Sequence, residues 1–133
     1  MTTKFGFKIL PCSATFKEPQ DGVLFASEYC TLKANAFASI PLGFKTWFPS
    51  SFLALVHAGP GDPQFRVIPA AIRGDCQREW NVVVRSTSDK TLYIERGAPI
   101  AAFSLIPRFT VVQEIVDDLP APAGSTIPHP KGL

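Results

Sequence analysis

Short runs of β-branched, aromatic and leucine residues recur along the chain at intervals of roughly ten residues, a spacing typical of all-β sandwiches and barrels. Proline, glycine, asparagine, aspartate or serine separates one run from the next, and these residues favour turns. Each run therefore predicts a short β-strand. The predicted strands are residues 4–10, 22–28, 37–48, 51–58, 66–72, 80–88, 91–97, 99–107 and 108–116.

The pattern predicts an all-β protein with a single domain, a jelly-roll β-sandwich. The nearest candidate for a helix, residues 111–119, lacks an N-cap and is rich in β-branched residues. The length of 133 residues suits one domain, and the hydrophobic share of 46% supplies a core. We expect the jelly roll to span residues 1–118.

The composition changes at residue 119. Residues 119–133 contain four prolines and no aromatic residue, so they cannot form a core of their own. We expect an extended C-terminal arm, which is either free in solvent or laid across a neighbouring subunit.

Charge and cysteine content exclude several classes of partner. The net charge is +2 without a block of lysine or arginine, so we expect no nucleic-acid partner. No apolar run approaches the length of a membrane span, and residues 1–10 lack the pattern of a signal peptide, so we expect no membrane partner and no secretion through a signal peptide. Cys12, Cys30 and Cys76 lack the spacing of metal ligands, which favours reduced thiols and no metal site.

Five stretches together resemble one family. They are "LPCSAT" (10–15), "GVLFA" (22–26), "IPLGFK" (40–45), the long stretch 79–107, and 111–128, which ends in Gly-Ser-Thr and a proline. Their order and spacing resemble those of the trimeric dUTPases, which are jelly-roll nucleotide hydrolases. The resemblance covers nearly the whole chain and implies a homotrimer with threefold symmetry.

The residues that perform hydrolysis in that family are replaced here. Hydrolysis of a triphosphate needs a carboxylate base, positive charge on the phosphates and usually Mg²⁺. By resemblance, the metal-linked acid falls on Val23, and the phosphate-contacting arginine and serine fall on Gly59 and Pro60. The glutamine that helps to coordinate phosphate falls on Ala102. Residues 124–126 keep Gly-Ser-Thr, but the arginine and phenylalanine of that last motif are missing.

The stretch "AIRGDCQREW" (71–80) corresponds to the family's water-activating hairpin. The catalytic aspartate falls on Arg73 and the tyrosine that excludes ribose falls on Cys76, while Asp75 and Glu79 keep the acidic character of their positions. We expect a residual pocket or partner-binding site here. The predicted set is Arg73, Asp75, Gln77, Arg78 and Glu79.

These replacements predict that the protein is not an enzyme and uses no cofactor. The resulting interpretation is a catalytically inactive, trimeric dUTPase-like protein with a structural or binding role, most consistent with a viral capsid decoration protein or an adaptor for a host factor. Its partners would be other viral structural proteins or a host protein, in the virion or the host cytoplasm. Two alternatives stay open: a divergent dUTP-type pyrophosphohydrolase using Asp75 or Glu79, and an adhesion ligand through Arg73-Gly74-Asp75.

Two further groups have alternative interpretations. "HAGPG" (57–61) is either a phosphate-cradling loop or a tight turn, and it lacks the lysine and the spacing of a P-loop. Trp47, Phe48 and Phe52 form either a binding surface or the packing of a jelly roll.

Overall fold

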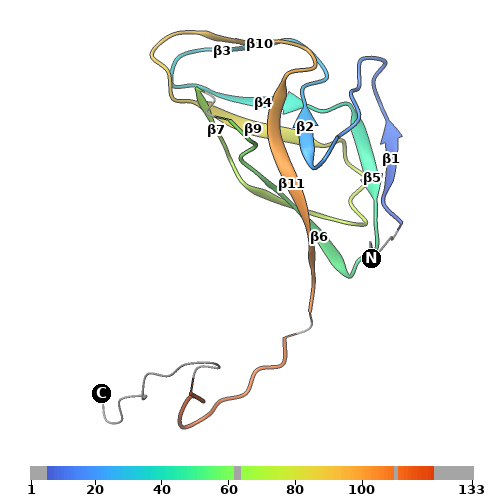
Figure 1. Cartoon of the computed structure of the whole chain (residues 1–133), viewed down its shortest axis with the longest axis vertical. Coiled ribbons are helices and arrows are strands. Elements are labelled where there is room, and N and C mark those ends of the chain that lie inside the picture. Colours follow the sequence, from blue (N-terminus) through green and yellow to red (C-terminus); the bar gives the residue numbers. More distant parts are fainter. Residues whose placement is uncertain (1–5, 62–63, 110, 122–133) are drawn as a thin grey trace.

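A computed structural model describes residues 6–61, 64–109 and 111–121 (Figure 1). The described residues form β-strands and turns but no helix, and they therefore contain no helix of the length and apolarity that a membrane crossing requires. The strands are β1 (Lys8–Pro11), β2 (Val23–Phe25), β3 (Cys30–Leu32), β4 (Phe37–Pro41), β5 (Phe44–Trp47), β6 (Phe52–His57), β7 (Phe65–Val67), β8 (Ala70–Arg73), β9 (Asn81–Ser86), β10 (Leu92–Ile94) and β11 (Pro99–Pro107).

The strands form four sheets, and every pairing between them is antiparallel. The largest sheet has the order β2-β11-β6-β8, and the others are β4-β9-β7, β1-β5 and β3-β10. Strand β11 lies between β2 and β6, so neighbours in this sheet are distant in sequence (Figure 1). Such connections are typical of Greek-key and jelly-roll proteins. The predicted all-β jelly-roll class is confirmed.

The strand predictions were correct for most of the chain and wrong at the end of it. Two predicted strands are each divided in two, at the Leu42-Gly43 turn and at Ile68-Pro69. The three-residue strand β3 was missed because its apolar run is too short to form a pattern. The strand predicted at 108–116 is absent from the described part of that segment, which leaves the body beyond β11 and has no strand beside it (Figure 1).

The predicted boundary between jelly roll and arm at residue 118 stays a prediction. In the described chain β11 ends at Pro107, and residues 111–121 carry no strand.

The core is built around the indole of Trp80, which is 2% exposed. Its ring centroid lies 5.3 Å from that of Phe44 and 5.5 Å from that of Phe103, so the indole joins β5 to β11. Its Nε1–H donates a hydrogen bond of 2.8 Å to Thr46 Oγ1, which satisfies a polar group that would otherwise be buried without a partner.

The hydrogen bond between Trp80 and Thr46 gives the first testable prediction. Replacement of Thr46 by valine keeps the side-chain shape and leaves the buried indole N–H without an acceptor. We expect the free energy of unfolding to fall by about 1–3 kcal/mol in denaturant titrations. Thr31→Val, the same change at an exposed position of β3, is the control and should change it by less than about 0.5 kcal/mol. Equal effects of the two changes would contradict the role of this hydrogen bond.

Candidate functional site

The turn after β8 holds the first candidate site. The N–H of Cys76 donates to the carbonyl oxygen of Arg73 over 3.1 Å, which closes a tight turn over residues 73–76. Gly74 is buried beneath this turn, and the N–H of Phe48 donates to its carbonyl oxygen over 3.3 Å. A Cβ atom at position 74 would overlap the carbonyl oxygen of Phe48. Glycine is therefore required here by close packing of two backbones.

Arg73 and Asp75 project from this turn and form an ion pair. Arg73 Nε lies 3.4 Å from Asp75 Oδ1, and the two side chains are 66% and 65% exposed. Together with Ala71, Ile72 and Cys76 they line a shallow hollow of about 340 Å³. The Asp75 carboxylate can accept hydrogen bonds from a ligand. If residues 73–75 served as an adhesion triplet, the side chains of Arg73 and Asp75 would already be paired with each other.

The other members of the predicted set point to different places. The Oε1 atom of Glu79 accepts a hydrogen bond of 3.1 Å from the N–H of Gly43, where φ is +79°, so this carboxylate holds the turn between β4 and β5. Gln77 lines a separate pocket beside β1 and β5, and Arg78 is exposed. The five residues therefore do not converge on one cavity.

The structure brings together three of the positions that resemblance assigned to catalysis. Val23 of β2 and Ala102 of β11 are register partners, and a Cβ atom at Gly59 would lie 3.1 Å from the backbone of Ala101. Pro60 and Gly61 follow in the same loop, and Gly61 has a φ of +97°. Arg73 and Cys76 belong to the opposite end of the sheet, because Arg73 pairs with Leu53 at the other end of β6 from His57. Residues 124–126 lie outside the described residues.

A histidine and a serine lie beside this group, and sequence analysis missed their association. His57 Nε2 lies 3.0 Å from Ser104 Oγ, and His57 Nδ1 lies 2.9 Å from the carbonyl oxygen of Ala58. Because a carbonyl can only accept, Nδ1 of the neutral ring carries the proton and Nε2 accepts from the hydroxyl. Residues 57 and 104 become neighbours through the pairing of β6 with β11. No local sequence signal predicts that pairing.

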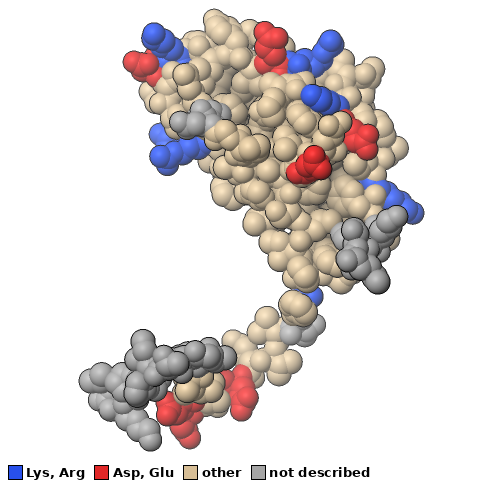
Figure 2. All heavy atoms as spheres, in the orientation of Figure 1, with Lys and Arg blue, Asp and Glu red and all other residues tan. Residues whose placement is uncertain are grey.

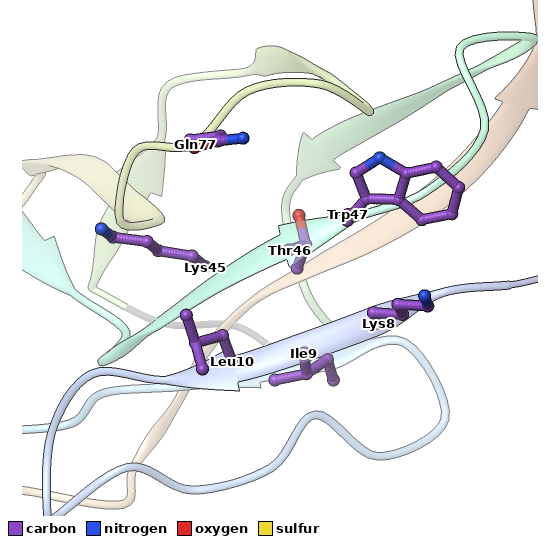
Figure 3. Close-up of a pocket in the computed structure, with 7 residues that line it drawn as sticks. All are labelled: Lys8, Ile9, Leu10, Lys45, Thr46, Trp47 and Gln77. Atoms are coloured by element: carbon purple, nitrogen blue, oxygen red, sulfur yellow. The ribbon is translucent and has the colours of Figure 1, made fainter.

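The second candidate site is a pocket of about 460 Å³ on the outer side of β1 and β5 (Figure 3). Lys8 and Leu10 come from β1, Lys45 and Trp47 come from β5, and Gln77 comes from the loop after the turn. Of the three aromatic residues considered as a surface, Trp47 is 47% exposed, whereas Phe48 is 1% exposed and belongs to the core. Phe52 at the start of β6 packs partly buried against the core.

No metal-binding group is formed by His, Cys, Asp and Glu within residues 6–61, 64–109 and 111–121. Burial, and secondarily the negative charge of Glu28, raise the pKa of the Cys30 thiol. Cys30 lies on β3, away from both candidate sites.

Comparison with solved structures identifies the fold. The chain matches a dUTPase of phage phi11 of S. aureus with a TM-score of 0.76 and 12% identity, over 87% of this chain and 99% of that one. It matches the Staphylococcus bacteriophage 80alpha dUTPase, solved with dUpNHpp, with a TM-score of 0.75 and 13% identity, over 90% and 92% of the two chains. No protein-family model and no curated protein sequence matches the chain. The protein has the dUTPase fold, as the order of its motifs predicted.

The prediction that the protein is not an enzyme, which was made from the replaced motif residues alone, is wrong. The solved structures described above, which match 86–90% of this chain, are those of dUTPases, which are enzymes. The prediction compared single residues at the aligned motif positions. The structure shows that the chain has the scaffold on which a nucleotide hydrolase is built. At 12–14% identity the likeness establishes the fold and leaves activity to be measured.

The packing of Gly74 against Phe48 yields a second prediction. Gly74→Ala introduces a methyl group into a backbone contact that has no room for it, and should lower the free energy of unfolding by about 1–3 kcal/mol or more. Gly6→Ala serves as the control, since its Cβ would lie at an ordinary 3.6 Å from the Trp47 ring. Denaturant unfolding measures both. If Gly74→Ala proved as stable as the wild type, the turn would have to adopt another backbone path.

Proposed function

We propose that the protein is a self-associating scaffold with the dUTPase fold, a homotrimer that binds a protein partner. The observation that carries this proposal is the composition of one sheet surface, which we name the outer face. It is the surface of the β2-β11-β6-β8 sheet directed away from the core. Its apolar members are Val23, Leu53, Leu55, Ala71, Ala102 and Ile106.

Register partners define the outer face. Ala54 and Val56 of β6 are 0% and 1% exposed and face the core, so Leu53 and Leu55 face outward. Ile106 is the register partner of Leu53 and is 41% exposed. An antiparallel sheet with one face in water normally alternates apolar and polar residues. On the outer face β6 carries Leu53 and Leu55 beside His57, and β11 carries Ala102 and Ile106 beside Ser104, so apolar side chains outnumber polar ones on both faces of these two strands.

A second copy of the chain is the cover that we propose. An exposed apolar surface of this kind marks an interface, and symmetric homo-oligomers are the commonest soluble assemblies. Resemblance to the trimeric dUTPases favours three copies around an axis. The positions Val23 and Ala102 are then apolar because they pack between subunits.

A partner-binding role is supported by what the fold does elsewhere. Solved phage dUTPases are described as controlling the transfer of virulence genes by a proto-oncogenic G protein-like mechanism. The same fold thus serves regulation in those proteins. For this chain, a viral structural protein or a host protein remains the expected partner.

A second candidate function is pyrophosphate release from a nucleotide. It is favoured by the likeness to dUTPases solved with dUpNHpp. Asp75 is the exposed carboxylate that would serve as the base, because Glu79 already bonds to the N–H of Gly43.

Self-association through the outer face is tested by solution mass. The wild type should sediment at three times the 14.5 kDa of one chain. Leu55→Glu and Ile106→Glu each bury a charge in the interface and should weaken association by at least about a hundredfold. Tyr93→Glu, at a position that is 65% exposed on β10, should leave the mass unchanged. A monomeric wild type, or trimers that both outer-face variants preserve, would refute the proposal.

The second candidate is tested by pyrophosphate release from dUTP with Mg²⁺. It requires turnover above about 0.1 s⁻¹ in the wild type and a decrease of at least about a hundredfold in Asp75→Asn. Asp89→Asn, at the turn before β10, is the control and should retain the wild-type rate. Absence of turnover in the wild type would eliminate this candidate.

A further inference from the structure

The β4-β9-β7 sheet carries two arginines that lie directly opposite each other. Arg85 of β9 is the register partner of Arg66 of β7, and both residues are exposed. Directly opposite side chains on antiparallel strands have Cβ atoms about 4.5–5.5 Å apart, and like charges in that arrangement are destabilising. No ion pair joins either arginine to a carboxylate in the described part of the chain. The two guanidinium groups therefore repel each other unless an anion from outside the chain lies between them.

Protection of a sheet edge does not explain both arginines. Arg66 lies on an edge strand of this sheet, where a charge prevents unwanted strand pairing. Arg85 lies on the strand between the other two and protects no edge. Its guanidinium instead lies 5.5 Å from the centroid of the Phe37 ring. Because Arg85 is the register partner of both Phe37 and Arg66, the three side chains form one row across the sheet.

Apolar side chains adjoin this row on the same surface. The alternation of β9 places its buried valines in the core and Val83 on the same side as Arg85. The N–H of Ile68 donates to the carbonyl oxygen of Val83 over 2.8 Å, which continues the pairing of β7 with β9. Phe37, Val83 and Ile68 are 61%, 39% and 40% exposed. We name the surface formed by Phe37, Arg66, Ile68, Val83 and Arg85 the arginine face.

The arginine face has the composition of a protein-binding surface. Arginine and aromatic residues are enriched in protein interfaces, and exposed apolar side chains that lie together mark such contacts. A planar guanidinium binds a carboxylate through two parallel hydrogen bonds. A carboxylate placed between Arg66 and Arg85 would replace their mutual repulsion by attraction. The matching partner is therefore a segment that carries an acidic residue beside an apolar one.

The distribution of charge favours an acidic protein segment over a nucleic acid. Nucleic-acid binding depends on a broad positive surface that follows the phosphates. Figure 2 shows lysine and arginine side chains scattered over one face of the body and mixed with aspartate and glutamate. On the arginine face the positive charge is confined to two side chains, and Ile68 and Val83 offer no ring on which a base could stack.

We propose that the arginine face binds an acidic segment of a partner protein. A carboxylate of the segment lies between Arg66 and Arg85, and an apolar side chain of the segment packs on Phe37 and Val83. The inference rests on the proposed partner-binding role, and it names the surface and the chemistry of that partner. The arginine face belongs to a different sheet from the outer face, so the two contacts do not compete for the same strands.

Labelled peptides test this contact in the full-length protein. The probe is a fluorescein-labelled peptide that combines glutamate with leucine, and the matched peptide has glutamine in place of each glutamate. Fluorescence anisotropy at low salt should show that the glutamate peptide binds at least about tenfold more tightly. Arg66→Gln with Arg85→Gln should weaken binding of the glutamate peptide by about tenfold or more and leave binding of the glutamine peptide unchanged.

Control variants separate the arginine face from other parts of the surface. Lys8→Gln with Lys45→Gln removes the same charge from the pocket on β1 and β5, and it should change the affinity for the glutamate peptide by less than about threefold. Phe37→Ala should weaken that binding by about threefold or more. Tyr93→Ala, at a residue that is 65% exposed on β10, should leave it unchanged. Thermal unfolding of each variant checks that its fold is intact.

Repulsion between the arginines has its own readout in the free protein. Arg66→Gln removes one of the two charges and keeps the contact of Arg85 with Phe37, so the unfolding temperature at low salt should stay the same or rise. Added salt should reduce any difference from the wild type. A fall in the unfolding temperature would show that Arg66 serves the fold, and it would overturn the inference.

Two results of the binding experiment would also overturn it. One is equal affinity for the glutamate and glutamine peptides, or a lysine control that weakens binding as much as the arginine change does. The other is tighter binding of a labelled single-stranded oligonucleotide that the arginine change abolishes, because the arginine face would then bind nucleic acid.

The result is distinguishable from that of the proposed self-association. If Leu55→Glu lowers the mass while the two peptides bind equally, the outer face holds the assembly and the arginine face does not bind an acidic segment. If the wild type has the mass of one chain and the arginine change still abolishes selective binding of the glutamate peptide, self-association fails and the arginine face stands.

Discussion

The structure depends on the position of Trp80. Its N–H donates to the carbonyl oxygen of Phe44 over 2.9 Å, and its own carbonyl oxygen accepts from the N–H of Leu42 over 3.0 Å. Its indole bonds to Thr46 and packs against Phe103. One residue thus ties the end of the segment 70–79 to β5 and to β11. Both candidate sites are attached to elements that this residue holds in place.

The two surfaces of the large sheet are under different constraints. Aromatic and branched residues fill its inner surface. This packing defines the dUTPase fold, and it does not depend on the chemistry of the outer face. On the outer face, Val23 and Ala102 stand where resemblance places an acid and a glutamine. Apolar side chains there favour contact with another subunit.

The sequence predicted the strands that have a clear pattern, such as the alternation of Asn81–Ser86, and the order of motifs predicted the fold. It did not predict which strands pair, because pairing depends on contacts between distant residues. For this reason the His57–Ser104 contact and the pocket of Lys8, Lys45 and Trp47 were missed. The strand expected at 108–116 has the required pattern, and within the described residues no strand lies beside it. The replacement of motif residues was not sufficient to decide whether the protein is an enzyme.

The central claim is that the outer face is a contact between copies of this chain. A crystal structure of the full-length protein tests it most directly. The account predicts three copies around an axis, with Leu53, Leu55 and Ile106 buried between them. A structure with the outer face open to solvent in every copy would contradict it.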